Sequence, residues 1–419
     1  MERTLKLVNM VKILGALSLL IFILGYSYIF GMAKAPKQGF YSGKIFYRTL
    51  NSKNVEVCGI KDSADKAGAL KIPGNVKYHG KTYRVTQIAD MERNIEDWTC
   101  TKKYKGGDYL ADSCRNTYDG YYMIKDETEI PDLNFRELCA TDHLTKVILP
   151  DTIEYIGDGS LGGYSHFKKI VFAKKYKKLV IGNDVFNSYC KKIVLPEGTV
   201  EIGDFAFDNY VDQTVVLPST LKKIGKSAFS KGERSKVKLS KNNPYFTMEK
   251  GVIYTKNMKT LVCATAAVPS VVKIPNSVTK MEINAFAMRK VKKVILNNKI
   301  REIPEAAFCD CVNLEEVSGM ENVKCIRYGA FYLCEKLKSI GKCENLRSIE
   351  RAAFWHDNNL TLYIGRKVAE IDNYALSGTK NETCMQINIP DGNDILEIEN
   401  GMLIKTSGSE RVAIAPVSD

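Results

Sequence analysis

The sequence predicts a repeat solenoid that is mainly β, a right-handed stack of coils with short parallel strands. The first observation is a pattern that recurs from about Leu133 onward, written L-x-x-I-x-L-P-x-x-V-x-x-I-G-x-x-A-F and often followed by x-x-C-x-x-L. The second is its period, because the residue that ends the pattern returns after about 21–26 residues in most copies. The third is that no single copy could bury its own apolar face, so the copies must stack. We call these final residues plugs, and they are Phe135, Leu161, Phe186, Phe207, Phe229, Phe286, Phe308, Phe331, Phe354 and Leu376.

Each part of the pattern has an expected structural role. The stretch L-x-x-I-x-L ends in alternating apolar and polar residues, as expected for a strand with one buried face. Proline then ends the strand, because it has no N–H to donate to a neighbouring strand. The stretch V-x-x-I-G turns the chain back, and its glycine is expected to adopt backbone torsions that other residues avoid. Plugs such as Phe207, Phe229, Phe308 and Phe331 are expected to fill the core between coils.

The first forty residues bear on the cellular compartment. A basic stretch, residues 1–12, precedes an uncharged apolar stretch, residues 13–33. A spanning helix needs about 20 residues, whereas a signal-peptide core has about 7–15, so the length favours an uncleaved transmembrane anchor. A cleaved signal peptide is the alternative, because Gly31-Met32-Ala33 fits a cleavage site, and a buried helix is disfavoured because the stretch has no polar face. Residues 1–35 are therefore predicted to place the chain outside the cytoplasm, held at the cell membrane or secreted.

Composition and motifs favour binding over catalysis. The chain has 419 residues and a formal net charge of +13, which favours anionic partners in general. It contains no GxSxG elbow, no HExxH motif and no phosphate-binding Walker loop. Its histidines, His79, His143, His166 and His356, are too far apart in sequence to indicate a metal site. The sequence therefore predicts no catalytic residue, no cofactor and no metal, and the lack of a recognisable nucleic-acid module argues against nucleic acid as a partner.

Two groups among the 12 cysteines have different interpretations. Cys190, Cys311 and Cys334 recur with the repeat shortly after a plug, and we expect them to be small buried thiols. Cys100 and Cys114 flank KKYKGGDYLADS within a tyrosine-rich, polar stretch, residues 91–130, that interrupts the pattern. In an exported protein this second pair is a candidate disulfide, with two unpaired thiols as the alternative.

One position of the repeat is enriched in lysine. Parallel coils stack their strands about 4.8 Å apart, so residues at equivalent positions should form a column on the surface. The residue just before the inward apolar residue of each L-x-x-I strand is Lys146, Lys169, Lys192, Thr214, Lys236, Val271, Lys293, Glu316, Ser339, Thr361 and Gln386. Lysine dominates the N-terminal half of this column only. The lysines either guard solubility along a sheet or form a stripe, Lys146, Lys169, Lys192, Lys236 and Lys293, that binds an anionic ligand.

The repeat resembles that of the BspA-type leucine-rich-repeat surface proteins of bacteria. Residues Ala69–Ala89, ALKIPGNVKYHGKTYRVTQIA, look like the opening unit of that family. Residues Asn243–Cys263, NPYFTMEKGVIYTKNMKTLVC, resemble its recurrent hairpin insert, with a turn at Gly251. Ile398–Ala415 looks like a truncated second insert.

The resemblance implies a domain organisation and a class of function. It covers roughly Phe40 to the C-terminus, except about Met91–Ile130. The implied domains are an opening β-segment with the first coil at 36–90, an irregular insert at 91–130, and a leucine-rich-repeat solenoid at 131–419 with hairpin inserts near 243–263 and 398–415. Members of the family are typically exported and implicated in adhesion or matrix binding, and the family has no catalytic residues.

Two functions are expected from these observations. The first is a cell-surface protein that mediates adhesion or binds a protein or glycan ligand outside the cell. The second is a structural envelope protein that binds anionic wall polymers through its basic stripe. In both, residues 13–33 hold the chain in the membrane or are lost with a cleaved signal, and neither function needs catalysis.

Overall fold

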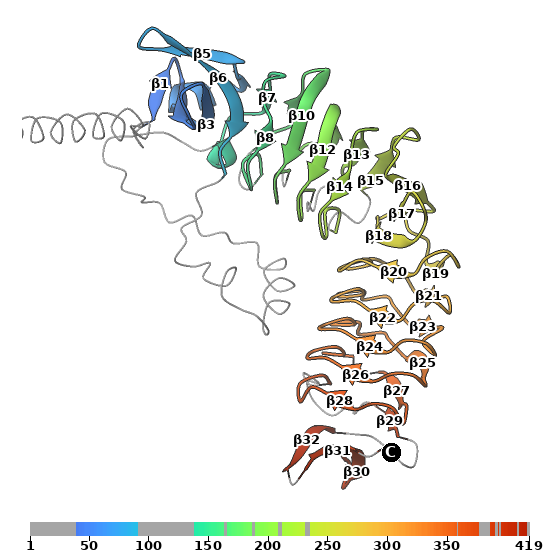
Figure 1. The fold of residues 1–419 in the computed structure, drawn as a ribbon. Coiled ribbons are helices and arrows are strands. Elements are labelled where there is room, and N and C mark those ends of the chain that lie inside the picture. Colours follow the sequence, from blue (N-terminus) through green and yellow to red (C-terminus); the bar gives the residue numbers. More distant parts are fainter. Residues whose placement is uncertain are drawn as a thin grey trace, which may run out of the picture.

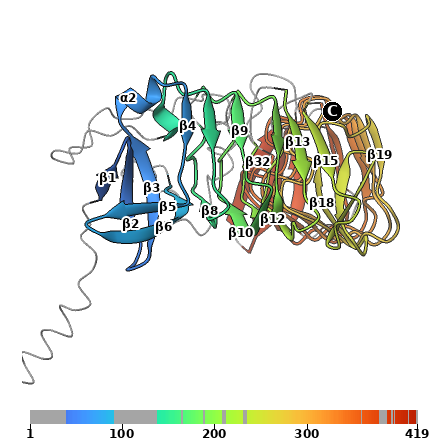
Figure 2. The same ribbon diagram turned by 90° about the horizontal axis from the view of Figure 1, so that it is seen from above.

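The computed structural model describes residues 39–90, 138–162, 166–186, 189–207, 212–230, 235–357, 359–376, 386–389, 393, 395–408 and 410–416. These residues form a mainly β solenoid, a curved stack of coils seen from the side in Figure 1 and from above in Figure 2. An opening unit lies at the N-terminal end of the curve. A three-stranded insert divides the stack into a first arm, residues 69–71 and 138–245, and a second arm, residues 268–389.

The opening unit is joined to the coils through one continuous sheet. Its strands β1 (Phe40–Ser42), β2 (Ile45–Thr49) and β3 (Asn54–Ile60) pair antiparallel. Strand β3 then pairs parallel with β6 (Lys81–Ile88), which also pairs antiparallel with β5 (Asn75–Tyr78). Because β6 continues parallel to the first strand of the coils, the opening unit covers the N-terminal end of the stack.

Two ladders of parallel strands run along the stack, and each coil contributes a strand to both. We call them the outer and inner ladders, because in the second arm their strands lie on the outer and inner sides of the curve (Figure 1). The outer strands of the first arm are β4 (Ala69–Lys71), β7 (Lys146–Ile148), β9 (Lys169–Val171), β11 (Lys192–Val194), β13 (Thr214–Leu217) and β15 (Lys236–Leu239). Those of the second arm are β19 (Val271–Lys273), β21 (Lys293–Ile295), β23 (Glu316–Ser318), β25 (Ser339–Cys343), β27 (Thr361–Ile364) and β29 (Gln386–Asn388).

The inner ladder comes from the V-x-x-I-G part of the repeat. In the first arm it follows β6 with β8 (Tyr155–Ile156), β10 (Lys175–Ile181), β12 (Glu197–Ile202) and β14 (Lys223–Ile224). In the second arm it consists of β20 (Lys280–Met281), β22 (Glu302–Ile303), β24 (Cys325–Ile326), β26 (Ser348–Ile349) and β28 (Glu370–Ile371). Adjacent strands pair in the repeat's own register, as in Ile202 with Ile224, so one apolar residue of each strand points inward at every level.

The predicted plugs form two stacks of phenylalanine rings inside the arms. Phe308 and Phe331 lie with ring centroids 5.2 Å apart and planes 6° apart, and Phe331 stacks on Phe354 in the same way. In the first arm, Phe207 and Phe229 stack at 5.5 Å. All four rings named in the prediction are buried, so that prediction is confirmed.

The insert separates two hydrophobic cores. Its strands β16 (Phe246–Glu249), β17 (Val252–Thr255) and β18 (Thr260–Ala264) form an antiparallel meander, and β18 pairs parallel with β20 of the next coil. Alternate residues of β17 face different cores: Val252 and Tyr254 pack in the second arm, and Ile253 packs in the first. The insert is therefore a wall between the arms rather than a surface appendage.

The C-terminal strands repeat the geometry of this insert. Strands β30 (Leu396–Glu399), β31 (Met402–Ser407) and β32 (Glu410–Pro416) pair antiparallel, with a register shift in β31–β32 like that in β17–β18. An asparagine before each meander, buried in the case of Asn243 and half-buried in the case of Asn393, accepts two backbone hydrogen bonds. Asn243 accepts them from Tyr245 and Phe246, and Asn393 accepts them from Ile395 and Leu396.

The role expected for the repeat's glycine is wrong. Gly203 and Gly225 end V-x-x-I-G stretches, yet neither has a positive φ. A Cβ at Gly225 would lie 2.2 Å from the carbonyl carbon of Gly203, so glycine is needed because consecutive coils approach each other closely there. The left-handed residue is instead the one two positions before the plug in the coils from Leu161 to Phe354, for example Phe205 with φ 55° and Ser227 with φ 50°. That residue is held by the stack, as when Phe205 N donates to Lys226 O at 3.0 Å.

Candidate functional site

The lysine column lies in register along the outer ladder. Lys146 pairs with Lys169, as expected for adjacent parallel strands. Lys192 pairs with Thr214, which pairs with Lys236. These pairs belong to two sheets, β4–β7–β9 and β11–β13–β15, and no hydrogen-bonded ladder among the described residues joins β9 to β11. The structure thus brings four of the five predicted lysines onto the first arm, where they occupy every level from β7 to β15 except that of Thr214.

The surface around these four lysines has no neutralising acid on its own strands. Lys169, Lys192 and Lys236 are exposed and Lys146 is half-buried. The six outer strands of the first arm contain no aspartate or glutamate. Within the described part of the chain, no salt bridge involves any of the four. Their charge is therefore available to a partner.

The fifth predicted lysine, Lys293, stands in a different setting. It lies in the second arm on β21, beyond the insert, and pairs with Val271 and Glu316 in a separate sheet. Its Nζ lies 2.8 Å from a carboxylate oxygen of Glu316, which neutralises it locally. The stripe expected to be continuous is thus interrupted before Lys293, because the insert takes the level between β15 and β19.

Two further lysines extend the basic surface of the first arm and were missed in the sequence. Lys71 on β4 and Lys238 on β15 are exposed and stand two residues after the column position. At the same position the intervening strands carry Ile148, Val171 and Val194. Val194 is 49% exposed, so an apolar column runs beside the lysines. A signal for Lys71 was present in the sequence, because residues 69–71 stand before an Ile-Pro pair as in the later outer strands. In the structure this strand pairs with β7.

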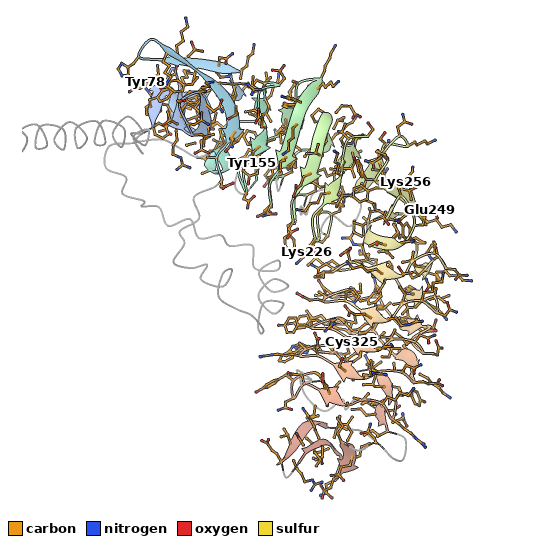
Figure 3. The ribbon with its side chains drawn as sticks, viewed as in Figure 1. Tyr78, Tyr155, Lys226, Glu249, Lys256 and Cys325 are labelled. Atoms are coloured by element: carbon orange, nitrogen blue, oxygen red, sulfur yellow. The ribbon has the colours of Figure 1, made fainter. Side chains whose placement is uncertain are left out.

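The inner ladder carries charged groups that are satisfied by one another. The guanidinium of Arg327 bridges Glu302 and Glu350 at 2.9 and 2.6 Å, and it thereby connects three levels of the second arm. In the first arm, side-chain oxygens of Asp158 and Asn183 each accept the backbone N–H of the next coil at 2.7 Å. Figure 3 labels Tyr155, Lys226 and Cys325 on this inner side. These contacts hold the coils in register, so the inner ladder is a weaker candidate for a charged ligand.

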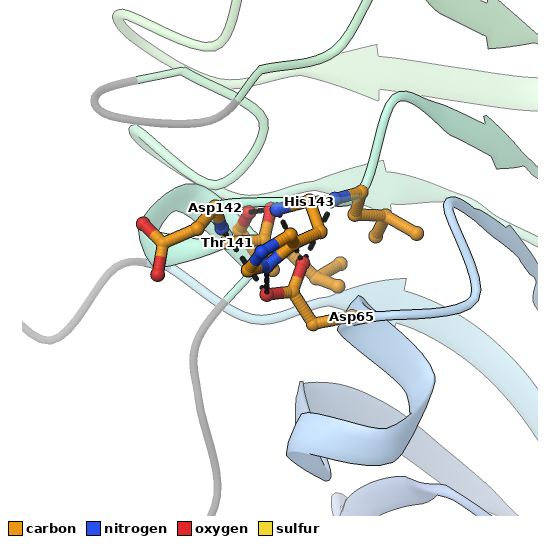
Figure 4. A network of polar contacts seen from close by, with 6 residues as sticks. Asp65, Thr141, Asp142 and His143 are labelled. Atoms are coloured by element: carbon orange, nitrogen blue, oxygen red, sulfur yellow. Dashed lines mark hydrogen bonds and ion pairs between the residues drawn. The ribbon is translucent and has the colours of Figure 1, made fainter.

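One cluster of metal-ligand residues lies outside the lysine surface. Ligand atoms of Asp65, Asp142 and His143 lie within 4.8 Å of one another (Figure 4). Asp65, at the end of α2 (Asp62–Asp65), is buried, and its Oδ1 accepts the backbone N–H groups of His143 and Leu144 at 3.0 and 2.8 Å. Its Oδ2 lies 3.1 Å from Nδ1 of His143 and accepts the Asp142 N–H at 3.3 Å.

The Asp65 carboxylate is therefore a clamp between the opening unit and the first coil. Burial alone would raise the pKa of Asp65, but the hydrogen bonds from His143, Leu144 and Asp142 outweigh it, and the pKa lies below its ordinary value. A cation would have to displace donors that already occupy both oxygens. The arrangement favours a structural role for Asp65 over a metal site.

We expect Asp65→Asn to lower the free energy of unfolding by about 1–3 kcal/mol, because the amide would turn a donor toward buried backbone N–H groups. Since the pKa of Asp65 is lowered in the folded state, its contribution is fully present above the unfolded pKa of about 3.9 and is lost as the pH falls through the lower folded value. Denaturant unfolding at pH 7 and near pH 3 measures this effect. The difference in unfolding free energy between parent and variant should be large at pH 7 and small near pH 3. The control is Asp151→Asn, an exposed aspartate, and an equal loss in both variants at pH 7 would contradict the clamp.

The three cysteines that recur with the repeat are structural. Cys190, Cys311 and Cys334 are all buried, as predicted, and Cys311 Sγ donates to the Phe286 carbonyl at 3.0 Å. Burial raises the pKa of Cys311 to about 12, so it is a poor nucleophile at neutral pH. Cys190 differs from the other two, because it takes the leucine position of its L-x-x-I strand. The candidate pair Cys100 and Cys114 lies outside the described residues.

The predicted membrane segment at 13–33 also lies outside the described residues. Among the helices of the residues that are described, none has the length and apolarity needed to cross a membrane.

Comparisons with known proteins agree with this architecture. Residues 128–250 and 268–383, more than half of the chain, match the profile of the "BspA type Leucine rich repeat region (6 copies)". A leucine rich cell surface protein from Faecalibacterium prausnitzii superposes with a TM-score of 0.50 at 19% identity, covering 85% of this chain and 96% of that one. The pneumococcal vaccine antigen PcpA superposes with a TM-score of 0.51 at 17% identity, covering 85% and 94%. A comparison with curated protein sequences finds no match. At these identities the two structures support the fold alone.

Proposed function

Because this chain belongs to the BspA-type leucine-rich-repeat family, we propose that it is a cell-surface protein whose solenoid binds an extracellular protein or glycan without catalysing a reaction. The lysine column of the first arm supports an anionic glycan or wall polymer as the ligand. A single observation carries this proposal: Lys146, Lys169, Lys192 and Lys236 recur at one repeat position, in register within each of two short sheets, on an outer face whose strands hold no acid.

The second arm supports the choice of surface by contrast. There the same repeat position carries Lys293, which is paired with Glu316, and then Ser339, Thr361 and Gln386. If these lysines served only solubility, we would expect them at this position on both arms, not concentrated and without ion pairs on the first. An exposed lysine contact contributes less than about 1 kcal/mol alone, but several acting on one polymer reinforce each other through effective concentration.

A structural role in the cell envelope is the second candidate, and the same column favours it. A protein that spaces or crosslinks anionic wall polymers would use the lysines alone, and its binding should weaken strongly as salt rises. Adhesion through an apolar protein interface, for instance across the exposed Val194 and its neighbours, should depend little on salt. Retention on a wall-polymer column and on a matrix-protein array, each at low and high salt, separates binding through the lysines from adhesion through an apolar interface.

The triple substitution Lys169→Glu, Lys192→Glu and Lys236→Glu should leave the fold intact, because all three side chains are exposed. We expect retention on an anionic glycan column at low salt to fall at least tenfold, since three weak favourable contacts become repulsive. The matched control reverses three exposed lysines of the second arm, Lys299, Lys324 and Lys342, for the same change in net charge. Equal losses of retention in both triple variants would mean that net charge alone causes the effect. Unchanged retention in the first variant would mean that the ligand binds elsewhere.

Export is required by this function, and residues 13–33 are proposed to direct it, as an anchor or as a cleaved signal. A reporter that is active only outside the cytoplasm, fused after Asp419, should be active in the full chain and inactive when residues 1–33 are deleted. Activity of a cytosolic reporter at the same position would overturn the proposed location.

A further inference from the structure

We infer that the anionic ligand lies along the stack, across the strands of the first arm, and that the span from Lys146 to Lys236 sets the length it can use. This inference rests on the proposed function and adds the orientation and size of the ligand. A ligand aligned with β11 would meet Lys192 and then the apolar Val194, and only along β15 would it meet a second lysine, Lys238. A ligand aligned with the stack meets Lys146, Lys169, Lys192 and Lys236 in turn.

The ends of the lysine column limit the useful length. From β7 to β15 the stack advances by four strand spacings, which corresponds to about 19 Å. Beyond β15 the surface belongs to the insert, where Figure 3 places Glu249 and Lys256. Past the insert, the column position holds the exposed, uncharged Val271, and then Lys293, already paired with Glu316. A polyanion gains no further free lysine of the column there.

A length series of sulfated glycan oligosaccharides tests this on the full chain. Affinity should rise about two- to fivefold for each further lysine engaged and stop rising once the oligosaccharide exceeds about 19 Å. Lys236→Glu should weaken only the longer oligosaccharides, whereas the central Lys169→Glu should weaken nearly all of them. Affinity that ignores length or keeps rising far beyond this span would overturn the inference, as would an equal effect of Lys236→Glu on every length. No binding of any oligosaccharide at low salt would instead overturn the proposed anionic ligand.

A separate observation concerns a buried hydrogen-bond column in the second arm. The residue three positions after a plug donates to the carbonyl of the plug one coil earlier. Cys334 Sγ donates to Phe308 O at 3.1 Å, and Cys311 Sγ donates to Phe286 O in the same way. Arg289 holds this position after the insert, and its longer side chain reaches Phe229 O at 3.2 Å.

Asp357 holds the next position of this hydrogen-bond column, three residues after Phe354. An ionised carboxylate has no proton, so it could not donate to a plug carbonyl as Cys311 and Cys334 do. Its side chain is fully buried, and neither carboxyl oxygen has a hydrogen-bond partner among the described residues. The described titratable groups around it, Cys334 and Glu335 with Asp310 further along the column, offer no positive charge. Burial, and to a smaller extent repulsion from Glu335, holds the pKa of Asp357 well above its ordinary value, although the nearby backbone of Cys334 acts to lower it. Residues 377–385, which follow in the chain, lie outside the described residues.

The structure assigns Asp357 the role of a neutral carboxylic acid that donates to the Phe331 carbonyl, so that the last coils are stabilised by acid. Its proton is the same kind of donor that the thiols supply one and two levels earlier. The folded state then holds a proton that the unfolded chain releases near pH 3.9, and the stability of these coils falls as the pH rises from there toward the folded pKa.

Amide hydrogen exchange of the coil at residues 337–376, followed between pH 4 and pH 8 after correction for the intrinsic rate, tests this role. We expect protection in the parent to fall at least tenfold over this range. Asp357→Cys, the residue the repeat itself uses, and Asp357→Asn, whose amide can donate at any pH, should remove that fall. The assignment would be overturned if both Asp357 variants kept the pH dependence of the parent. It would also be overturned if only the control Asp310→Asn lost that dependence.

Discussion

Replacing Phe331 with alanine is expected to lower the free energy of unfolding by about 3–5 kcal/mol, the largest effect of any single substitution considered for this protein. The ring is fully buried and stacks on both neighbours, with centroids 5.2 Å from Phe308 and 5.2 Å from Phe354. Its removal leaves a cavity that the adjacent coils cannot fill, because their backbones are fixed by hydrogen bonds such as Phe331 N to Ala353 O at 2.9 Å.

Thermal and denaturant unfolding, read together with hydrogen exchange, measure this effect. Coils contact only their neighbours, so protection should be lost first around Phe331 and kept in the first arm. Tyr363→Ala is the matched control, an aromatic residue on the exposed face of an outer strand in the same arm. A Phe331→Ala protein that melts like this control would show that the plug contributes little.

Gly225→Ala should be the second most damaging change, at about 1–3 kcal/mol and nearer the upper value. The added Cβ would lie 2.2 Å from the Gly203 carbonyl carbon and 2.4 Å from the Asp204 backbone nitrogen, which are backbone atoms and cannot rotate away. The two coils must separate, which weakens the bond from Gly225 N to Ile202 O at 2.9 Å.

The neighbouring substitution Lys226→Ala provides the control, because that side chain is exposed and the change adds no atom to the contact between coils. The unfolding free energies of the two variants are to be compared at pH 7. A Gly225→Ala variant as stable as Lys226→Ala would mean that the coils move apart without cost, against the close approach seen here.

Much of the candidate site could be predicted from the repeat itself. The alignment of L-x-x-I strands placed Lys192, Thr214 and Lys236 at one position, and in the fold they are paired residues of adjacent strands. This works because one coil adds one strand, so an equal position in the pattern becomes an equal height on the surface. Binding by these lysines stays a prediction.

Other features needed the whole stack. The buried contact of Asp65 with His143 and Leu144 joins residues almost eighty positions apart, and no local pattern marks it. Pairing of Lys293 with Glu316 depends on two adjacent coils, and it separates that lysine from the other four. The insert at β16–β18 was recognisable as a hairpin, yet only packing made it the wall between two cores.

The sequence by itself determined the period of the coils, their buried residues and the position of the lysine column, because each follows from the order of apolar and polar residues within one copy. The tertiary structure alone decided which residues take left-handed torsions and why the repeat needs glycine. Asp184, Phe205 and Ser227 share a positive φ although their side chains have nothing in common. The cause is the hydrogen bond that each coil makes with the next, as from Asp184 N to Asp204 O at 2.9 Å, and such contacts exist only once the coils are stacked.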